Sequence, residues 1–215
     1  MRTHIVRGTT AAVLALTLGL AAAACGDDEQ ADRPSGTSTA PNGDVFNDAD
    51  VEFASDMIQH HAQAVQMVVM TQGRSLDPEF QQLTEQIRAA QVPEIETMSD
   101  WLTAWGEEVP PTSLDHANAG HDMDDMSESM EDMDMGDMPG AMTADDLDDL
   151  ENAAASAFEE MWLEMMIEHH EGAVEMAQDE QEDGANPAAQ DLAATIIETQ
   201  EAEIETMERM LDELP

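Results

Sequence analysis

The chain contains one helical pattern twice, and the two copies are offset by 109 positions without a gap. In the first copy the adjacent pair His60-His61 is followed by Pro78, which can start a second helix. The same residue types recur at His169-His170 and Pro187. A unit of two helices cannot bury its apolar face alone, so duplicated units pack against each other. The repeat therefore predicts one domain built from two similar halves.

Two helices are predicted in the first copy, residues 48–106. The first begins near Asn47 or Asp48, either of which can cap it, and runs to about Gln72. The second begins at Asp77-Pro78, a capping carboxylate followed by a proline of the first turn, and runs to about Trp105. Pro93 lies inside this second helix and predicts a kink or a local break.

Two further helices are predicted in the second copy, residues 144–215. One begins at Thr143, where Thr-x-x-Asp resembles a capping box, and runs to about Glu182. The other begins at Asn186-Pro187 and ends near Leu214. No segment predicts a strand. The short connections within each copy make neighbours antiparallel, so the predicted fold is all-α: a four-helix bundle of two tandem αα-hairpins.

Residues 1–24 have the organisation of a bacterial lipoprotein signal peptide, with a basic start, a short apolar run and small residues before the only cysteine, Cys25. We expect cleavage before Cys25 and lipidation of its thiol. Ordinary cleavage that leaves an unpaired cysteine is the alternative. Residues 25–47 predict a disordered tether. The chain is thus expected to be exported and lipid-anchored at the outer face of the cytoplasmic membrane, or periplasmic.

The net charge is −43, from 49 acidic and 6 basic residues. Such a charge opposes nucleic acid binding, because the phosphate backbone demands basic partners. A strongly negative field attracts cations. Solubility, or adaptation to salty surroundings, would explain the same charge, so composition alone does not choose between these interpretations.

Histidine and methionine share one stripe of the first predicted helix, because Met57, His60 and Met67 are spaced three and seven residues apart. His61 lies about 100° further round the helix, so the two imidazoles point in different directions. A methionine at helical spacing is usually core filler, and a single buried histidine is usually structural. Duplication of the histidine pair with its flanking methionines favours metal ligation over those alternatives.

The predicted linker between the copies, residues 107–143, is acidic and rich in methionine. Thioether sulfur is a soft, uncharged ligand that suits Cu(I) and Ag(I). Because an unfolded linker has no core to fill, we interpret its methionines as a metal-capture segment; drift of a low-complexity sequence is the alternative. Its candidate ligands are His116, His121, Met123, Met126, Met130, Met133, Met135, Met138 and Met142.

A motif around the first histidine pair points to a known family. It comprises Asp56-Met57-Ile58, His60-His61, Ala64-Val65, Met67, Gln91, Glu94-Ile95 and Met98. The motif resembles that of a bacterial family, domain of unknown function 305, over about residues 48–105 and again over 157–214. Members are similar to ferritin-like helical bundles, and one is a periplasmic copper-binding protein.

The resemblance implies copper, Cu(I) in preference, as the bound metal, with Ag(I) as a soft analogue. Asp56, Glu94 and Glu203 are candidate carboxylate ligands. In the second copy Met165 replaces Asp56 and Gly172 replaces Gln63, so the two halves are expected to differ. The His and Met ligands that the resemblance implies are Met57, His60, His61, Met67, Met98, Met166, His169, His170, Met176 and Met207.

The leading hypothesis is a membrane-tethered copper-binding protein that sequesters Cu(I) or passes it to a partner protein, rather than an enzyme. A ferritin-like metal oxidase is the first alternative. Di-iron sites use Glu-x-x-His motifs, whereas the residues three before His60 and His169 are Met57 and Met166. Copper is therefore favoured over iron. A structural or interaction module without metal is the second alternative.

Overall fold

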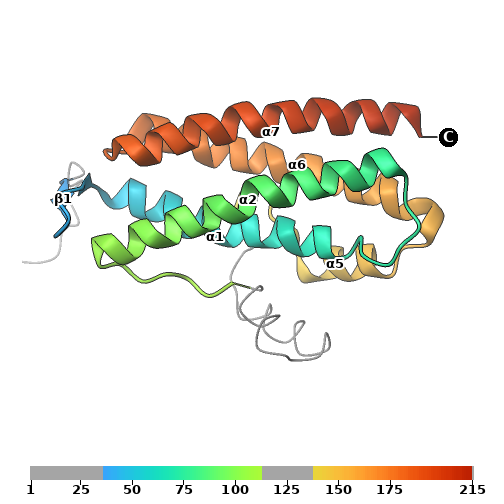
Figure 1. The fold of residues 1–215 in the computed structure, drawn as a ribbon, viewed down its shortest axis with the longest axis horizontal. Coiled ribbons are helices and arrows are strands. Elements are labelled where there is room, and N and C mark those ends of the chain that lie inside the picture. Colours follow the sequence, from blue (N-terminus) through green and yellow to red (C-terminus); the bar gives the residue numbers. More distant parts are fainter. Residues whose placement is uncertain (1–35, 113–137, 215) are drawn as a thin grey trace, which may run out of the picture. The chain divides into compact units, whose positions relative to one another are not determined.

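The computed structural model describes residues 36–112 and 138–214, which are mostly helical, so the all-α class is confirmed. Four helices are long and one is short within these ranges (Figure 1). The strands form one antiparallel pair. The elements are β1 Ser38–Thr39, β2 Val45–Phe46, α1 Asp48–Val69, α2 Pro78–Trp105, α5 Ala144–Glu151, α6 Ala155–Asp183 and α7 Pro187–Glu213.

The helix starts lie at the residues that the capping signals predicted. The Asn47 side chain accepts a hydrogen bond from the Asp50 backbone amide, and the Asp50 carboxylate accepts one from the Asn47 amide. This reciprocal pair satisfies two amides that a helix start leaves unpaired. At α2, the Asp77 carboxylate accepts from the Glu79 amide, 2.7 Å away. Asn186 caps α7 in the same way.

The prediction of one continuous third helix is wrong, because residues 152–154 divide it into α5 and α6. Arg74, from the loop after α1, stabilises the interruption between α5 and α6. Its guanidinium donates to the carbonyl oxygens of Glu151 and Ala153, at 2.6 and 3.3 Å, and lies 3.9 Å above the Phe158 ring. These contacts supply donors for carbonyls that the interrupted helix leaves unpaired. In contrast, α2 is continuous across Pro93, so no break occurs there.

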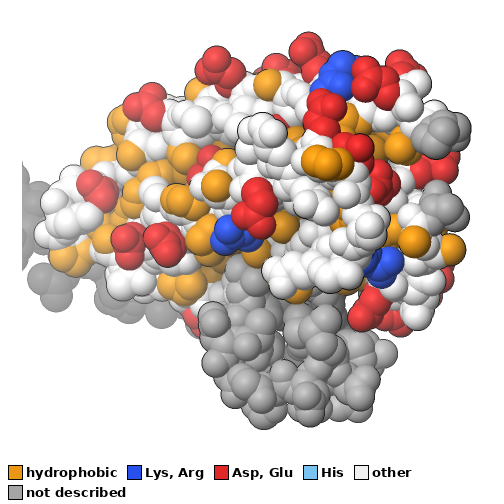
Figure 2. Space-filling model, turned by 45° about the vertical axis from the view of Figure 1, so that its right-hand side comes forward, with side chains coloured by type: hydrophobic (Ala, Val, Ile, Leu, Met, Phe, Trp, Pro, Cys, Tyr) orange, Lys and Arg blue, Asp and Glu red, His pale blue; other side chains and the backbone are white. Residues whose placement is uncertain are grey.

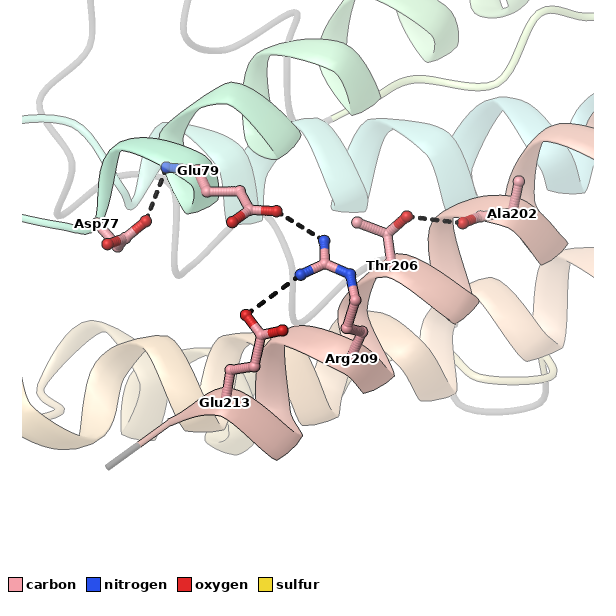
Figure 3. A network of polar contacts seen from close by, with 6 residues as sticks. All are labelled: Asp77, Glu79, Ala202, Thr206, Arg209 and Glu213. Atoms are coloured by element: carbon pink, nitrogen blue, oxygen red, sulfur yellow. Dashed lines mark hydrogen bonds and ion pairs between the residues drawn. The ribbon is translucent and has the colours of Figure 1, made fainter.

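The long helices pack as α1 against α2, α6 against α7, and α1 against α6. Arg209 of α7 pairs with Glu79 at the start of α2, at 2.6 Å, and with Glu213 one turn later (Figure 3). Both pairs are exposed and screened by solvent, so they contribute little to the stability of the fold. The buried apolar side chains between the helices therefore supply most of the stability.

Part of the predicted tether is structured. Residues 25–47 were expected to be disordered, yet 36–47 contain the β1–β2 hairpin, whose turn uses Gly43 at a φ of 96°. Phe46 is buried and stacks on Trp105 of α2, with ring centroids 4.8 Å apart. The apolar pair Val45-Phe46 was not recognised as a strand because turn-forming residues surround it in the sequence. Its burial against α2 ties the start of the domain to the end of the first hairpin.

Acidic side chains are scattered over the face that Figure 2 shows, and basic ones are fewer there. Within residues 36–112 and 138–214, no helix is both long enough and apolar enough to cross a membrane.

Candidate metal centre

The two copies meet at His60 of α1 and His169 of α6. Their ring centroids are 3.7 Å apart and both side chains are fully buried. The Nε2 atom of His60 lies 3.0 Å from the carbonyl oxygen of Pro139, which can only accept, so Nε2 carries the hydrogen. The Nδ1 atom of neutral His60 then presents its lone pair. It has no hydrogen-bond partner, and neither ring nitrogen of His169 has one among the described residues.

The second histidine of each pair faces a carboxylate of its own hairpin. His61 Nε2 donates to Glu94 of α2 at 2.8 Å, and His170 Nε2 donates to Glu203 of α7 at 2.9 Å. Both imidazoles are fully buried. A carboxylate on one ring nitrogen fixes the tautomer and makes the other nitrogen a better ligand. The Nδ1 atoms of His61 and His170 are also buried without a partner.

The facing histidines are held in their neutral form. Burial, followed by the charge that the adjacent His61 would carry, lowers the pKa of His60 to about 3, although the contact with Pro139 acts in the opposite direction. Burial, together with the neighbouring histidines, lowers the pKa of His169 well below its usual value. Neutral imidazole is the form that binds metal, because protonation occupies the lone pair.

The predicted methionine ligands divide into two buried groups. Met57 and Met98 lie in one apolar cluster, with Met176 packed against it. Met67, Met166 and Met207 lie in the other cluster. The offset of 109 converts each group into the other, and each draws one thioether from three different helices. Four of these methionines, Met57, Met67, Met166 and Met176, lie on the helices that carry the histidines, one to two turns away, and the other two lie on α2 and α7.

A short segment crosses the helices directly over this region. We call residues 138–142 the strap. The Gln63 side chain holds it from α1: its amide donates to the Met142 carbonyl at 2.8 Å and accepts from the Met142 amide at 2.7 Å. On α6, a Cβ on Gly172 would lie 2.0 Å from the Pro139 carbonyl oxygen, so only glycine lets the strap approach. Gly140 is equally constrained, at a φ of 69°.

The strap changes the interpretation of the predicted linker. Met142 is 6% exposed in the apolar core, and Met138 and Pro139 are also packed rather than extended into solvent. The expectation that methionines here have no core to fill is therefore wrong for Met142. The remaining candidates lie outside the described residues, as does Cys25: His116, His121, Met123, Met126, Met130, Met133 and Met135.

Carboxylates contribute less to the centre than expected. Glu94 and Glu203 reach His61 and His170, but Asp56 lies on the wall of a neighbouring cleft instead. Burial and the nearby Glu52 raise the pKa of Asp56. In residues 36–112 and 138–214, no three His, Cys, Asp or Glu side chains converge as a metal site does.

Two neighbours of the histidines, Pro139 and Gly140, were missed as parts of the site. Pro139 and Gly140 were treated as linker, although Gly172 at the position of Gln63 signalled a close backbone approach. Gln91 and Gln200 are buried, and their amide groups have no hydrogen-bond partner. Each lies one helical turn before the carboxylate that contacts a histidine.

Solved structures with this fold include copper- and silver-bound proteins. A secreted protein from Streptomyces coelicolor is 30% identical, with 77% of this chain and 91% of that chain covered and a TM-score of 0.62. A fragment from Deinococcus radiodurans is 28% identical, with 82% and 100% covered and a TM-score of 0.63. Both carry the label DUF305.

The protein CopM is also similar. Its Cu(II)-bound structure is 29% identical, with 76% of this chain and 95% of that chain covered and a TM-score of 0.58. Its Cu(I)-bound structure is 27% identical, with the same coverage and TM-score. CopM has also been crystallised with silver. No curated protein is significantly similar in sequence. The profile of the domain of unknown function DUF305 matches residues 50–211, three quarters of the chain, and the protein belongs to that family.

Proposed function

We propose that the protein binds Cu(I) and Ag(I) through its paired histidines and the flanking methionines, and so sequesters copper or passes it to a partner protein. The observation that carries the proposal is the set of four buried Nδ1 atoms without a hydrogen-bond partner, one on each paired histidine. An unsatisfied polar atom in a protein interior costs stability and needs an explanation. A soft cation would satisfy these atoms.

The chemistry of the donors supports a soft monovalent metal. Neutral imidazole and thioether carry no charge, so they stabilise Cu(I) and Ag(I) by covalency, whereas hard cations need oxygen ligands. The similarity to CopM, a protein solved with Cu(I), Cu(II) and silver, agrees with this choice. Six buried or partly buried methionines support it further, four on the helices that carry the histidines and one each on α2 and α7.

The wider assignment follows from the same proposal. The long helices form one ferritin-like four-helix bundle of two tandem hairpins, consistent with the α1–α6 contact between the copies. Residues 1–24 direct export, and Cys25 carries the lipid anchor. The methionines of residues 123–135 capture the ion first. The likeness to a secreted relative supports export.

The test is an anaerobic Cu(I) titration of the full chain against a chromophoric chelator. We expect the double change His60→Gln and His169→Gln to weaken the tightest binding at least about tenfold, equivalent to about 1.4 kcal/mol. Glutamine keeps a donor for the Pro139 carbonyl but removes the imidazole lone pair. Unchanged affinity in a variant that keeps its helicity would overturn the assignment to these residues.

A matched variant separates the helices from the linker. Changing Met123, Met126, Met130, Met133 and Met135 to leucine keeps size and removes only the thioethers. We expect lower Cu(I) stoichiometry with unchanged affinity at the histidine site. A loss of the tightest binding in this variant, with none in the histidine variant, would place copper in the linker alone.

Metal oxidase activity remains the alternative function, because a buried copper site beside thioethers could cycle between Cu(I) and Cu(II). The described residues offer no cluster of carboxylates for a di-iron centre, so copper rather than iron is the metal that such an oxidase would use. Aerobic Cu(I) oxidation by the protein, faster than that of free Cu(I) in buffer, would favour the oxidase.

A further inference from the structure

An acidic cleft of about 430 Å³ opens between the first half of α1 and the second half of α6. Its wall carries Glu52 and Asp56 from α1, and Asp179, Glu180 and Asp183 from α6. No basic residue lines it. Clefts lined by one sign of charge focus the field and raise the local concentration of the opposite ion. The ligand that this field selects is a cation.

One carboxyl group of the cleft is distinguished by its burial. Glu180 is only 2% exposed, and as a carboxylate neither of its oxygens accepts a hydrogen bond. A buried carboxylate without donors is costly unless a cation or a proton neutralises it. Burial, with the neighbouring Asp50 carboxylate, raises the pKa of Glu180 to about 8. The protonated carboxyl group of Glu180 is also hydrogen-bonded to Asp50, which helps it to keep its proton.

The cleft adjoins the facing histidines through the strap. Pro139 forms part of the cleft wall, and its carbonyl oxygen is the atom that His60 Nε2 contacts at 3.0 Å. On α1, Asp56 lies four residues before His60, on the same face. On α6, Met176 of the cleft wall lies seven residues after His169. The two stripes that carry the histidines thus continue into the cleft.

We propose that this cleft is the route by which a soft monovalent cation reaches His60 and His169, with its carboxylates attracting the ion and its thioethers receiving it. The inference rests on the proposed function. Met138 and Met176 supply the thioethers in the wall. The carboxylates act by their field rather than as a chelating cage, because no three of them converge as metal ligands among the described residues.

The test measures how fast Ag(I), supplied as silver nitrate in chloride-free buffer, loads the full chain. Quenching of tryptophan fluorescence in a stopped-flow instrument reports loading, since Trp162 lies two turns before His169 on the same stripe. The cleft variant is Glu52→Gln, Asp56→Asn and Asp179→Asn. We expect its loading rate to fall about fivefold at low ionic strength and to depend less on added sodium nitrate.

A control variant removes the same number of charges elsewhere: Glu205→Gln, Glu208→Gln and Asp212→Asn on α7, none of which lines the cleft. We expect it to load at nearly the rate of the unchanged protein. Equal rates for the two variants would overturn the cleft as the route. Both should still bind Ag(I) at the unchanged stoichiometry after gel filtration. If the unchanged protein binds no Ag(I), the proposed function fails first, and the route fails with it.

Discussion

At the scale of single residues, the two histidines of each pair make different contacts. His60 and His169 meet across the two copies, whereas His61 and His170 are each oriented by a carboxylate within their own hairpin. The sequence predicted that adjacent imidazoles diverge, because neighbouring helical positions differ by about 100°. It could not predict which one faces the other copy, since that depends on how α1 and α6 pack.

Glu180 makes stability depend on pH in a window where the histidines do not. Its pKa is raised from 4.5 to about 8, so the folded protein holds a proton that the unfolded chain releases. Its contribution is therefore complete below about pH 4.5 and is lost as the pH rises through 8. The lowered pKa values of His60 and His169 act oppositely, weakening the fold as the pH falls below 6.5.

We therefore expect Glu180→Gln to flatten the decline in unfolding free energy between pH 6.5 and 8. Glutamine keeps the shape of the side chain but cannot ionise. Urea unfolding at closely spaced pH values measures the effect, and Glu182→Gln, on the exposed surface of the same helix, is the control. Parallel curves for the unchanged protein and Glu180→Gln would mean that Glu180 is ionised without cost.

At the scale of elements, the strap crosses α1 and α6 and so contacts both copies of the repeat. Gln63 and Gly172 occupy equivalent positions in the repeat. The Gln63 side chain forms hydrogen bonds with the strap, whereas Gly172 has no side chain and so leaves room for the strap backbone. The difference between the copies was visible in the sequence. Its cause was not, because the strap had no periodic pattern of its own and was interpreted as linker.

The change Gly172→Ala tests whether the strap lies against α6, because its effect on stability there should be opposite to the effect in an unobstructed helix. In an unobstructed helix, replacing glycine by alanine stabilises the fold by about 1 kcal/mol. Here the new Cβ would lie 2.0 Å from the Pro139 carbonyl oxygen, which is backbone and cannot rotate away. We expect a net destabilisation of about 1–2 kcal/mol in urea unfolding. Glu171→Ala, exposed on the same turn, should change stability by no more than about 0.5 kcal/mol. A stabilised Gly172→Ala would show that the strap is not held against α6.

Local signals located the long helices well and their interruptions poorly. Asn47, Asp77 and Asn186 cap helices as predicted, because a capping side chain acts within its own turn. The division between α5 and α6 depends instead on Arg74, which is distant in sequence. Likewise, the burial of Phe46 depends on Trp105, which stacks on it from the end of α2. Contacts between distant segments decide such features, and a single sequence does not contain their geometry.

At the scale of the whole molecule, the negative charge lowers the stability of the fold rather than raising it. The chain carries a net charge of −43. Among the described residues, the ion pairs of Arg88 and Arg209 are exposed and therefore worth little. Like charges repel more strongly in the compact state than in the expanded chain. The same repulsion that lowers stability provides the field that attracts a cation to the cleft.

Screening should therefore stabilise the metal-free protein. Raising sodium chloride from about 0.01 M to about 1 M shortens the screening length from about 30 Å to about 3 Å. We expect the melting temperature to rise by at least about 4 °C, the shift that corresponds to about 1–2 kcal/mol. Potassium and choline chloride should act equally if screening is the cause, since choline cannot enter a site built for a bare ion. A melting temperature that rises with sodium alone would reveal a specific sodium site, and one that does not rise would show that the carboxylates are already neutralised by protons. The second result would remove the field on which the cleft depends.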